Sequence, residues 1–84
     1  MALMISFLAR KIWFMSGKHL LKLPEEYAGL FSHGQMVEVE IKVGAESYRL
    51  SGVVKHYRRG VFVKLPPEAR ALLNERGLRV RLYA

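Results

Sequence analysis

The sequence predicts a mostly β fold with two short helices, in which six strands close into a small β-barrel with approximate twofold symmetry. Two observations favour this fold: residues 17–31 resemble residues 59–73, and strict alternation of apolar and polar residues follows the first copy. The chain has 84 residues, enough for one domain, and halves of about 42 residues are each too short to bury a core alone. We therefore expect the two repeats, about 5–43 and 47–84, to share one core.

The repeat is defined by a constant shift along the chain. A shift of 42 residues aligns identical residues, namely Lys22 with Lys64, Leu23 with Leu65, Pro24 with Pro66, Glu26 with Glu68 and Leu30 with Leu72. Past this segment Gly34 aligns with Gly77, so the second copy has gained one residue. We interpret the pattern as an internal duplication.

Each repeat is expected to contain a hairpin followed by a helix. Residues 5–15 are rich in Ile, Phe and Trp and predict a strand, and residues 18–23 alternate as a second strand after a turn at Ser16-Gly17. Pro24 lacks a backbone N–H and is followed by two glutamates, a pattern that favours the start of a helix. Apolar residues at helical spacing then predict a helix of about ten residues in each repeat; they are Tyr27, Leu30 and Phe31 in the first copy and Ala69, Leu72 and Leu73 in the second.

Four more strands complete the prediction. Residues 36–43 alternate without a fault and residues 78–83 repeat that pattern, while strands are also expected at 47–57 and 61–65. Gly52 interrupts the strand expected at 47–57 and predicts a bulge or a close backbone approach there. The order strand, strand, helix, strand thus occurs twice, and closure into a barrel would remove exposed edges.

The composition limits the compartment and the partners. The chain has no cysteine, which fits a reducing cytoplasm, and its shortage of Asp, Asn and Gln suggests a thermophilic source. The apolar first nine residues are too short to span a bilayer and do not have the pattern of a signal peptide, so no membrane association is expected. The net charge is +7, of which residues 45–84 carry +6, and this favours an anionic partner.

The helix starts resemble those of a known superfamily. The motifs Leu23-Pro24-Glu25-Glu26 and Leu65-Pro66-Pro67-Glu68, with the helix, glycine and alternating strand that follow them, resemble the cradle-loop barrels. That superfamily includes the AbrB-type swapped-hairpin regulators, the RIFT barrels and the double-psi barrels. The resemblance implies a RIFT-like or double-psi-like barrel, and its members include DNA-binding regulators, enzyme domains and protein-interaction domains.

A basic turn is the main candidate for a binding site. The residues Lys55, His56, Tyr57, Arg58 and Arg59 put cations around one aromatic ring, where they could contact phosphates and stack on a base. Lys18 lies at the matching turn of the first repeat, and Arg49 and Arg10 are expected to help. We predict a nucleic-acid-binding protein, with DNA favoured over RNA. The alternatives are a protein-interaction or small-anion-binding module, or a solvated loop that aids solubility.

No catalytic or metal-binding pattern accompanies this turn. The histidines at 19, 33 and 56 lack metal-ligand spacing, and no nucleophile with a base partner is apparent. We therefore expect a protein that is not an enzyme, has no cofactor or metal, and is a monomer or a homodimer. Arg79 and Arg81 are expected to pair with opposite charges on the surface, and the aromatic residues Trp13, Phe14, Tyr48 and Phe62 to lie in the core.

Overall fold

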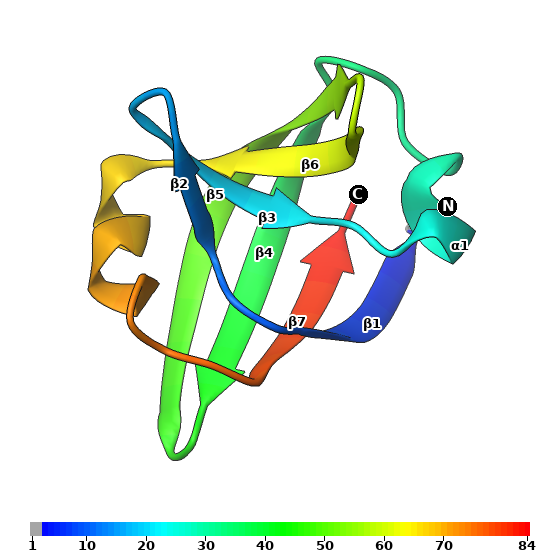
Figure 1. The fold of residues 1–84 in the computed structure, drawn as a ribbon. Coiled ribbons are helices and arrows are strands. Elements are labelled where there is room, and N and C mark those ends of the chain that lie inside the picture. The colour runs from blue at the N-terminus through cyan, green and yellow to red at the C-terminus, as the bar shows by residue number, and fades with distance from the viewer. Residues whose placement is uncertain (1–2) are drawn as a thin grey trace.

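The computed structural model describes residues 3–84 and contains one antiparallel sheet of seven strands with two short helical segments (Figure 1). The elements in chain order are β1 (Met4–Ala9), β2 (Trp13–Met15), β3 (Lys18–Lys22), α1 (Glu25–Ala28), β4 (Met36–Val43), β5 (Glu46–Tyr57), β6 (Gly60–Leu65), the 3-10 helix η1 (Pro67–Leu72) and β7 (Leu78–Tyr83). In the sheet the strands follow the order β1-β7-β4-β5-β6-β3-β2.

The predicted closed barrel of six strands is wrong, because the expected strand at 5–15 is divided in two. Its first part, β1, pairs with β7, whereas its second part, β2, pairs with β3. Between them, Arg10 accepts a hydrogen bond from the Gly77 backbone N–H at 3.1 Å, and the Ile12 side chain is 2% exposed in the core. The two parts become opposite edges of the sheet, and no pairing joins β1 to β2 in the described chain. The sheet is therefore open and has seven strands.

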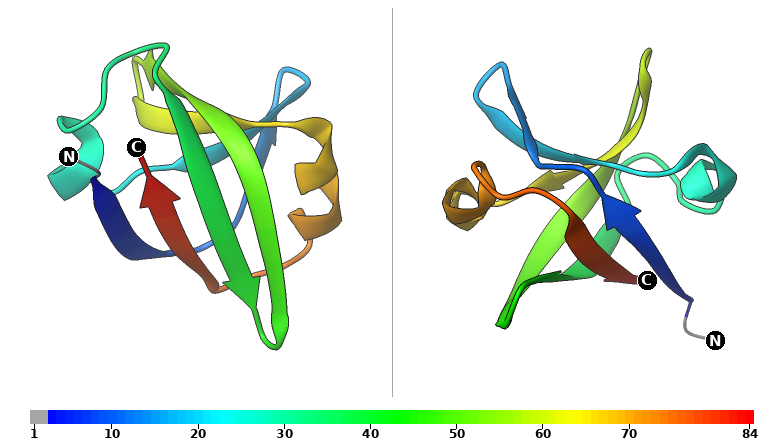
Figure 2. Two further views of the ribbon diagram at one scale, coloured as in Figure 1. Left: turned by 180° about the vertical axis from the view of Figure 1, so that it is seen from behind. Right: turned by 60° about the horizontal axis from the view of Figure 1, so that its bottom comes forward.

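The core lies between two halves of this coiled sheet. One half consists of β1, β7, β4 and the start of β5, and the other of the end of β5 with β6, β3 and β2 (Figures 1 and 2). Alternate residues of both halves point inward and are buried, among them Ile5, Leu21, Val39, Ile41, Val54, Val63, Val80 and Leu82. The alternation predicted for β4 and β7 is confirmed, since it puts their apolar residues in this core.

The two predicted helices are much shorter than expected. The first, α1, has four residues and ends at Gly29, and Leu30 is 52% exposed instead of lying on a buried helix face. The following loop pairs with β5: the Gly34 N–H donates to the Val54 carbonyl at 2.7 Å, and the Val54 N–H donates to the Gln35 carbonyl at 2.8 Å. These bonds satisfy the backbone in place of further helical turns. The second segment, η1, is a 3-10 helix of six residues that buries Ala69 and Leu72.

Gly52 marks the place where β5 changes partner, from β4 to β6. Val37 of β4 lies opposite Gly52, and the next residue, Val53, lies between Met36, the first residue of β4, and Lys64 of β6. A Cβ atom on Gly52 would collide with the Val63 side chain and lie 3.2 Å from the Lys64 carbonyl oxygen. The close backbone approach predicted here is confirmed, and it lets one long strand serve both halves of the sheet.

The element order repeats within this open sheet. The series β2, β3, α1, β4 is followed by β5, β6, η1, β7, and across the two series β3 pairs with β6 and β4 with β7. The repeated leucines, Leu23 and Leu65, are 2% and 3% exposed in the same core. An origin by duplication stays a prediction.

Candidate nucleic-acid interface

One outer face of the sheet carries several positive charges and no negative charge among them. Four lysines point outward from β3, β5 and β6, and two arginines occupy the β5–β6 turn. We call these six residues the basic face; they are Lys18, Lys22, Lys55, Arg58, Arg59 and Lys64. The strand register brings them together, because Lys22 and Lys55 lie on either side of Phe62, and Lys64 lies opposite Leu20. The outward positions of these described strand segments include no Asp or Glu. Among residues 3–84, none of the six cations pairs with a carboxylate within 4.0 Å.

A small apolar cluster lies beneath these charges. Leu20 and Phe62 are 2% and 5% exposed although they alternate outward, and neither belongs to the main core. The Tyr57 ring packs beside Phe62 with 5.8 Å between ring centroids. The sheet thus buries apolar side chains on both of its surfaces at this point, and the outer cluster forms the floor of a recess.

That recess is a pocket of about 290 Å³ between two hairpins. Its walls come from the β2–β3 and β5–β6 hairpins, which project to the same side of the molecule (Figure 2, right). The lining residues are Met15, Ser16, Lys18, Leu20, Tyr57, Arg58, Arg59 and Phe62. The Lys18 Nζ lies 5.6 Å from the centroid of the Tyr57 ring, across the pocket from its own hairpin. An apolar floor with a cationic rim suits a ligand that has both a flat apolar part and a negative charge.

Turn residues account for the position of the cations. Ser16 and Gly17 both have positive φ, at 51° and 73°, as the two central residues of a tight type I′ hairpin require. This turn places Lys18 directly opposite Met15. Gly60 begins β6 with φ at 137°, and a Cβ atom there would lie 3.3 Å from the Lys22 side chain. Glycine therefore lets the lysine lie against the β5–β6 turn.

The structure brings together five of the eight residues singled out in the sequence. Lys18, Tyr57, Arg58 and Arg59 line the same pocket, and Lys55 extends outward from the same face of β5. The two basic turns therefore form one surface, although they are about 40 residues apart in the chain.

The other three residues lie away from this surface. His56 alternates to the opposite side of β5, where its backbone N–H donates to His33 Nδ1 at 2.9 Å and its Nε2–H donates to the Phe31 carbonyl at 2.8 Å. Arg49 lies over the Tyr83 ring in the other half of the sheet, at 5.3 Å from the ring centroid. Arg10 lies in the bend between β1 and β2.

Sequence reasoning did not identify Lys22, Lys64, Leu20 or Phe62 as parts of the site. The repeat aligned the two lysines with each other, but only the pairing of β3 with β6 shows that they share a face with the basic turn. The expectation that four aromatic residues form the core is largely wrong. Trp13 and Phe14 are 37% and 56% exposed on the edge strand β2, Phe62 lies in the outer cluster, and Tyr48 packs against the core but is only partly buried.

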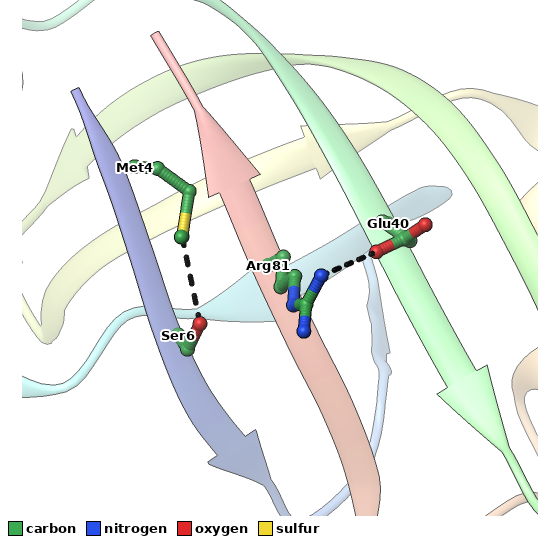
Figure 3. Close-up of polar contacts among 4 residues, drawn as sticks. All are labelled: Met4, Ser6, Glu40 and Arg81. Atoms are coloured by element: carbon green, nitrogen blue, oxygen red, sulfur yellow. Dashed lines mark hydrogen bonds and ion pairs between the residues drawn. The ribbon is translucent and has the colours of Figure 1, made fainter. Parts of the chain in front are cut away.

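The other half of the sheet has a mixed outer face. Arg81 Nη1 lies 3.9 Å from Glu40 Oε1 on the neighbouring strand, so the expected pairing of this arginine is confirmed (Figure 3). Arg79 instead donates to the Gly44 carbonyl at 3.3 Å, and the Ser51 hydroxyl donates to Glu38 at 2.8 Å. Figure 3 also shows the Ser6 hydroxyl 3.5 Å from the Met4 sulfur on β1. Arg81 thus has a carboxylate beside it, whereas Lys42 and Arg79 lie opposite each other without one, so this face mixes positive and negative charges.

The described part of the chain has neither a metal-binding cluster nor a membrane-spanning helix. Residues 3–84 bring together no group of three His, Asp or Glu side chains that could hold a metal ion. No helix within the same residues has the length and apolar character needed to cross a membrane. Comparison of the chain with protein-family models, with curated proteins and with solved structures finds no match.

Proposed function

We propose that the protein is a non-enzymatic nucleic-acid-binding module that contacts phosphates through the basic face. The observation that carries this proposal is the gathering of six cations without a carboxylate partner on one face; three of them, Lys18, Arg58 and Arg59, line one pocket. Nucleic acids present phosphates in a regular series, and Lys and Arg side chains are the usual partners of phosphate oxygens.

The mechanism is charge neutralisation with release of counterions. Arg58 and Arg59 are exposed at the tip of the β5–β6 hairpin, where a polyanion meets them first. Lys18 faces them across the pocket, and the strand lysines extend the same positive surface along the sheet. Neither helical segment contributes a residue to the pocket, and the two lie on opposite sides of the molecule (Figure 1). We therefore expect affinity to depend on salt and little on base sequence.

The test is a binding measurement with two variants of equal net charge. Fluorescence anisotropy with labelled 12-residue DNA is measured for the unmodified protein, for Arg58→Gln/Arg59→Gln, and for Arg10→Gln/Arg49→Gln. Each double variant removes two positive charges, but only the first removes them from the basic face. Log affinity falls as log salt rises, and we expect the first variant to make this slope less steep by about 1.4 to 1.8. That change corresponds to two lost phosphate contacts. The second should leave this slope nearly unchanged.

Three results would contradict the proposal. One is the absence of binding to DNA or RNA at about 50 mM salt, a condition under which six phosphate contacts give easily measured affinity. Another is an equal effect of the two double variants, which would assign binding to net charge alone. The third is displacement of the DNA by polyglutamate as effectively as by unlabelled DNA, which would point to an acidic protein as the partner.

A further inference from the structure

The pocket in the basic face has an apolar floor that phosphate binding does not use. Leu20 and Phe62 are almost fully buried there, outside the main core, and the Tyr57 ring lies against Phe62. A surface that only neutralised phosphates would need charged side chains and no recess. The floor therefore indicates a second part of the ligand, which is flat and apolar.

The size and surroundings of the pocket fit one ring system. A volume of about 290 Å³ is at the lower end of pockets that enclose small ligands, and three cations, Lys18, Arg58 and Arg59, stand on its rim. A nucleobase has apolar faces and is attached to phosphates on either side. An unpaired base stacked on Tyr57 would place those phosphates toward the rim cations.

The neighbouring edge strand extends this apolar surface. Trp13 on β2 lies opposite Leu20, which lines the pocket, and its ring is 37% exposed with Lys11 Nζ 4.1 Å from its centroid. Lys11 lies over one face of this ring, so the next base of a strand would stack on the other face.

A duplex makes poor use of these features. Its bases are stacked inside the helix and only their edges are accessible in the grooves, where polar side chains read them. The edge strand β2 consists of Trp13, Phe14 and Met15, all exposed and all apolar, so a β2–β3 hairpin in the major groove would bring few hydrogen-bonding groups to base edges. Single strands, by contrast, expose their base faces.

We infer that the pocket takes an unpaired base of a single-stranded nucleic acid, stacked against Tyr57 over the floor formed by Leu20 and Phe62. Lys18, Arg58 and Arg59 hold the phosphates on either side of that base. This inference depends on the proposed function, because it names the form of nucleic acid that the same face binds.

The experiment compares two single strands that have the same number of phosphates, one with and one without bases, and adds a duplex, which has twice as many phosphates and keeps its bases stacked inside. Anisotropy at one low salt concentration is measured with a 12-residue oligothymidylate, a 12-residue abasic strand and a 12-base-pair duplex. We expect the oligothymidylate to bind roughly 5- to 150-fold more tightly than the abasic strand, which is the value of stacking one base. The single tryptophan, Trp13, supplies a second readout, as its fluorescence should be quenched by oligothymidylate and not by the abasic strand.

A pair of variants locates the stacked base. Tyr57→Ala should lose roughly 5- to 150-fold in affinity for oligothymidylate and little for the abasic strand, whereas Tyr57→Phe keeps the ring and should keep the affinity. Equal binding of all three ligands would overturn the inference and leave phosphate binding intact. Tighter binding to the duplex would overturn it too, whereas failure of all three ligands to bind would remove the proposed function itself.

Discussion

The two halves of the sheet bury similar interiors and present different exteriors. In the half made of β1, β7, β4 and the start of β5, the outward residues include two carboxylates, Glu38 and Glu40, and Glu40 lies beside Arg81. In the half made of β2, β3, β6 and the end of β5, no outward carboxylate accompanies the six cations of the basic face. Since the inward residues of both halves are the same kinds of aliphatic side chain, the requirement for a core does not explain the difference outside.

The long strand β5 makes this contrast clearest, because it belongs to both halves. Before Gly52 its outward residues include Arg49 and Ser51, which lie opposite Glu40 and Glu38 of β4. After Gly52 they include Lys55 and Tyr57, which lie opposite Phe62 and Gly60 of β6. Whether a positive residue of β5 has a carboxylate opposite it therefore depends on the strand beside it. Three substitutions test whether this difference between the two halves holds.

The largest effect is expected where the two halves join. Gly52→Ala adds a Cβ atom that meets the Val63 side chain and approaches the Lys64 carbonyl, so β5 can no longer pass closely over β6. We expect the free energy of unfolding to fall by about 1–3 kcal/mol, the usual cost of overpacking a tight interior. Urea unfolding followed by circular dichroism measures it.

A second glycine provides the matched control. Gly29 has φ at −75° and nothing within 4 Å of a built Cβ atom, so Gly29→Ala meets neither strain nor a collision. It should leave stability unchanged or raise it by up to about 1 kcal/mol, through the entropy of the unfolded chain. If the two substitutions cost the same, the close approach at residue 52 is not what joins the two halves.

A smaller effect, this time an increase in the free energy of unfolding, is expected for a substitution in the interior of the half that carries the basic face. His19 on β3 is 9% exposed and its buried Nε2 has no hydrogen-bond partner in the described structure. His19→Leu removes that unsatisfied group from an apolar setting and should raise the free energy of unfolding by about 1 kcal/mol. For a chain of this size, the melting temperature should rise by roughly 4–8 °C.

The control for this change is a histidine that does have a partner. His33 Nδ1 accepts the backbone N–H of His56 at 2.9 Å, so His33→Leu leaves that N–H without its acceptor. It should lower stability by about 1 kcal/mol, the usual net value of one hydrogen bond. A loss of stability in His19→Leu would mean that the buried imidazole has a favourable role in the folded protein.

The smallest effect is expected on the mixed face. Glu40 and Arg81 are 3.9 Å apart, and the arginine side chain is 53% exposed, so solvent screens their attraction. A double-mutant cycle with Glu40→Gln and Arg81→Gln should give a coupling of less than about 0.5 kcal/mol. A coupling above about 1 kcal/mol would show that charge pairing helps to hold this half together, in contrast to the basic half.

Local patterns predicted the later strands well and the helices poorly. The alternation in residues 36–43 leaves only one register that buries its valines, and β4 occupies these residues. The spacing of Tyr27, Leu30 and Phe31 also fits a helix, but the backbone after Gly29 bonds to β5 instead. Such bonds join segments about twenty residues apart, and no local pattern reports them.

The candidate site was only partly predictable for the same reason. The basic turn at 58–59 and Lys18 could be identified because they are charged and lie at predicted turns. Lys22 and Lys64 looked like ordinary outward residues of separate strands until the pairing of β3 with β6 joined them to the turn. Arg49 looked equivalent to Lys55 on the same strand, and the change of partner at Gly52 separated them.

Short segments of the chain were enough to predict the inward residues of β4 and β7, the positions of the turns and the excess of positive charge, because these depend on periodicity, glycine and composition. Long-range strand pairing settled the rest: the sheet stays open, β1 and β2 form opposite edges, and six cations share one face, three of them around a pocket over Leu20 and Phe62. Those outcomes depend on which strands lie side by side. Strand pairing over long distances is set by how all the segments fill one core together, and not by any segment alone.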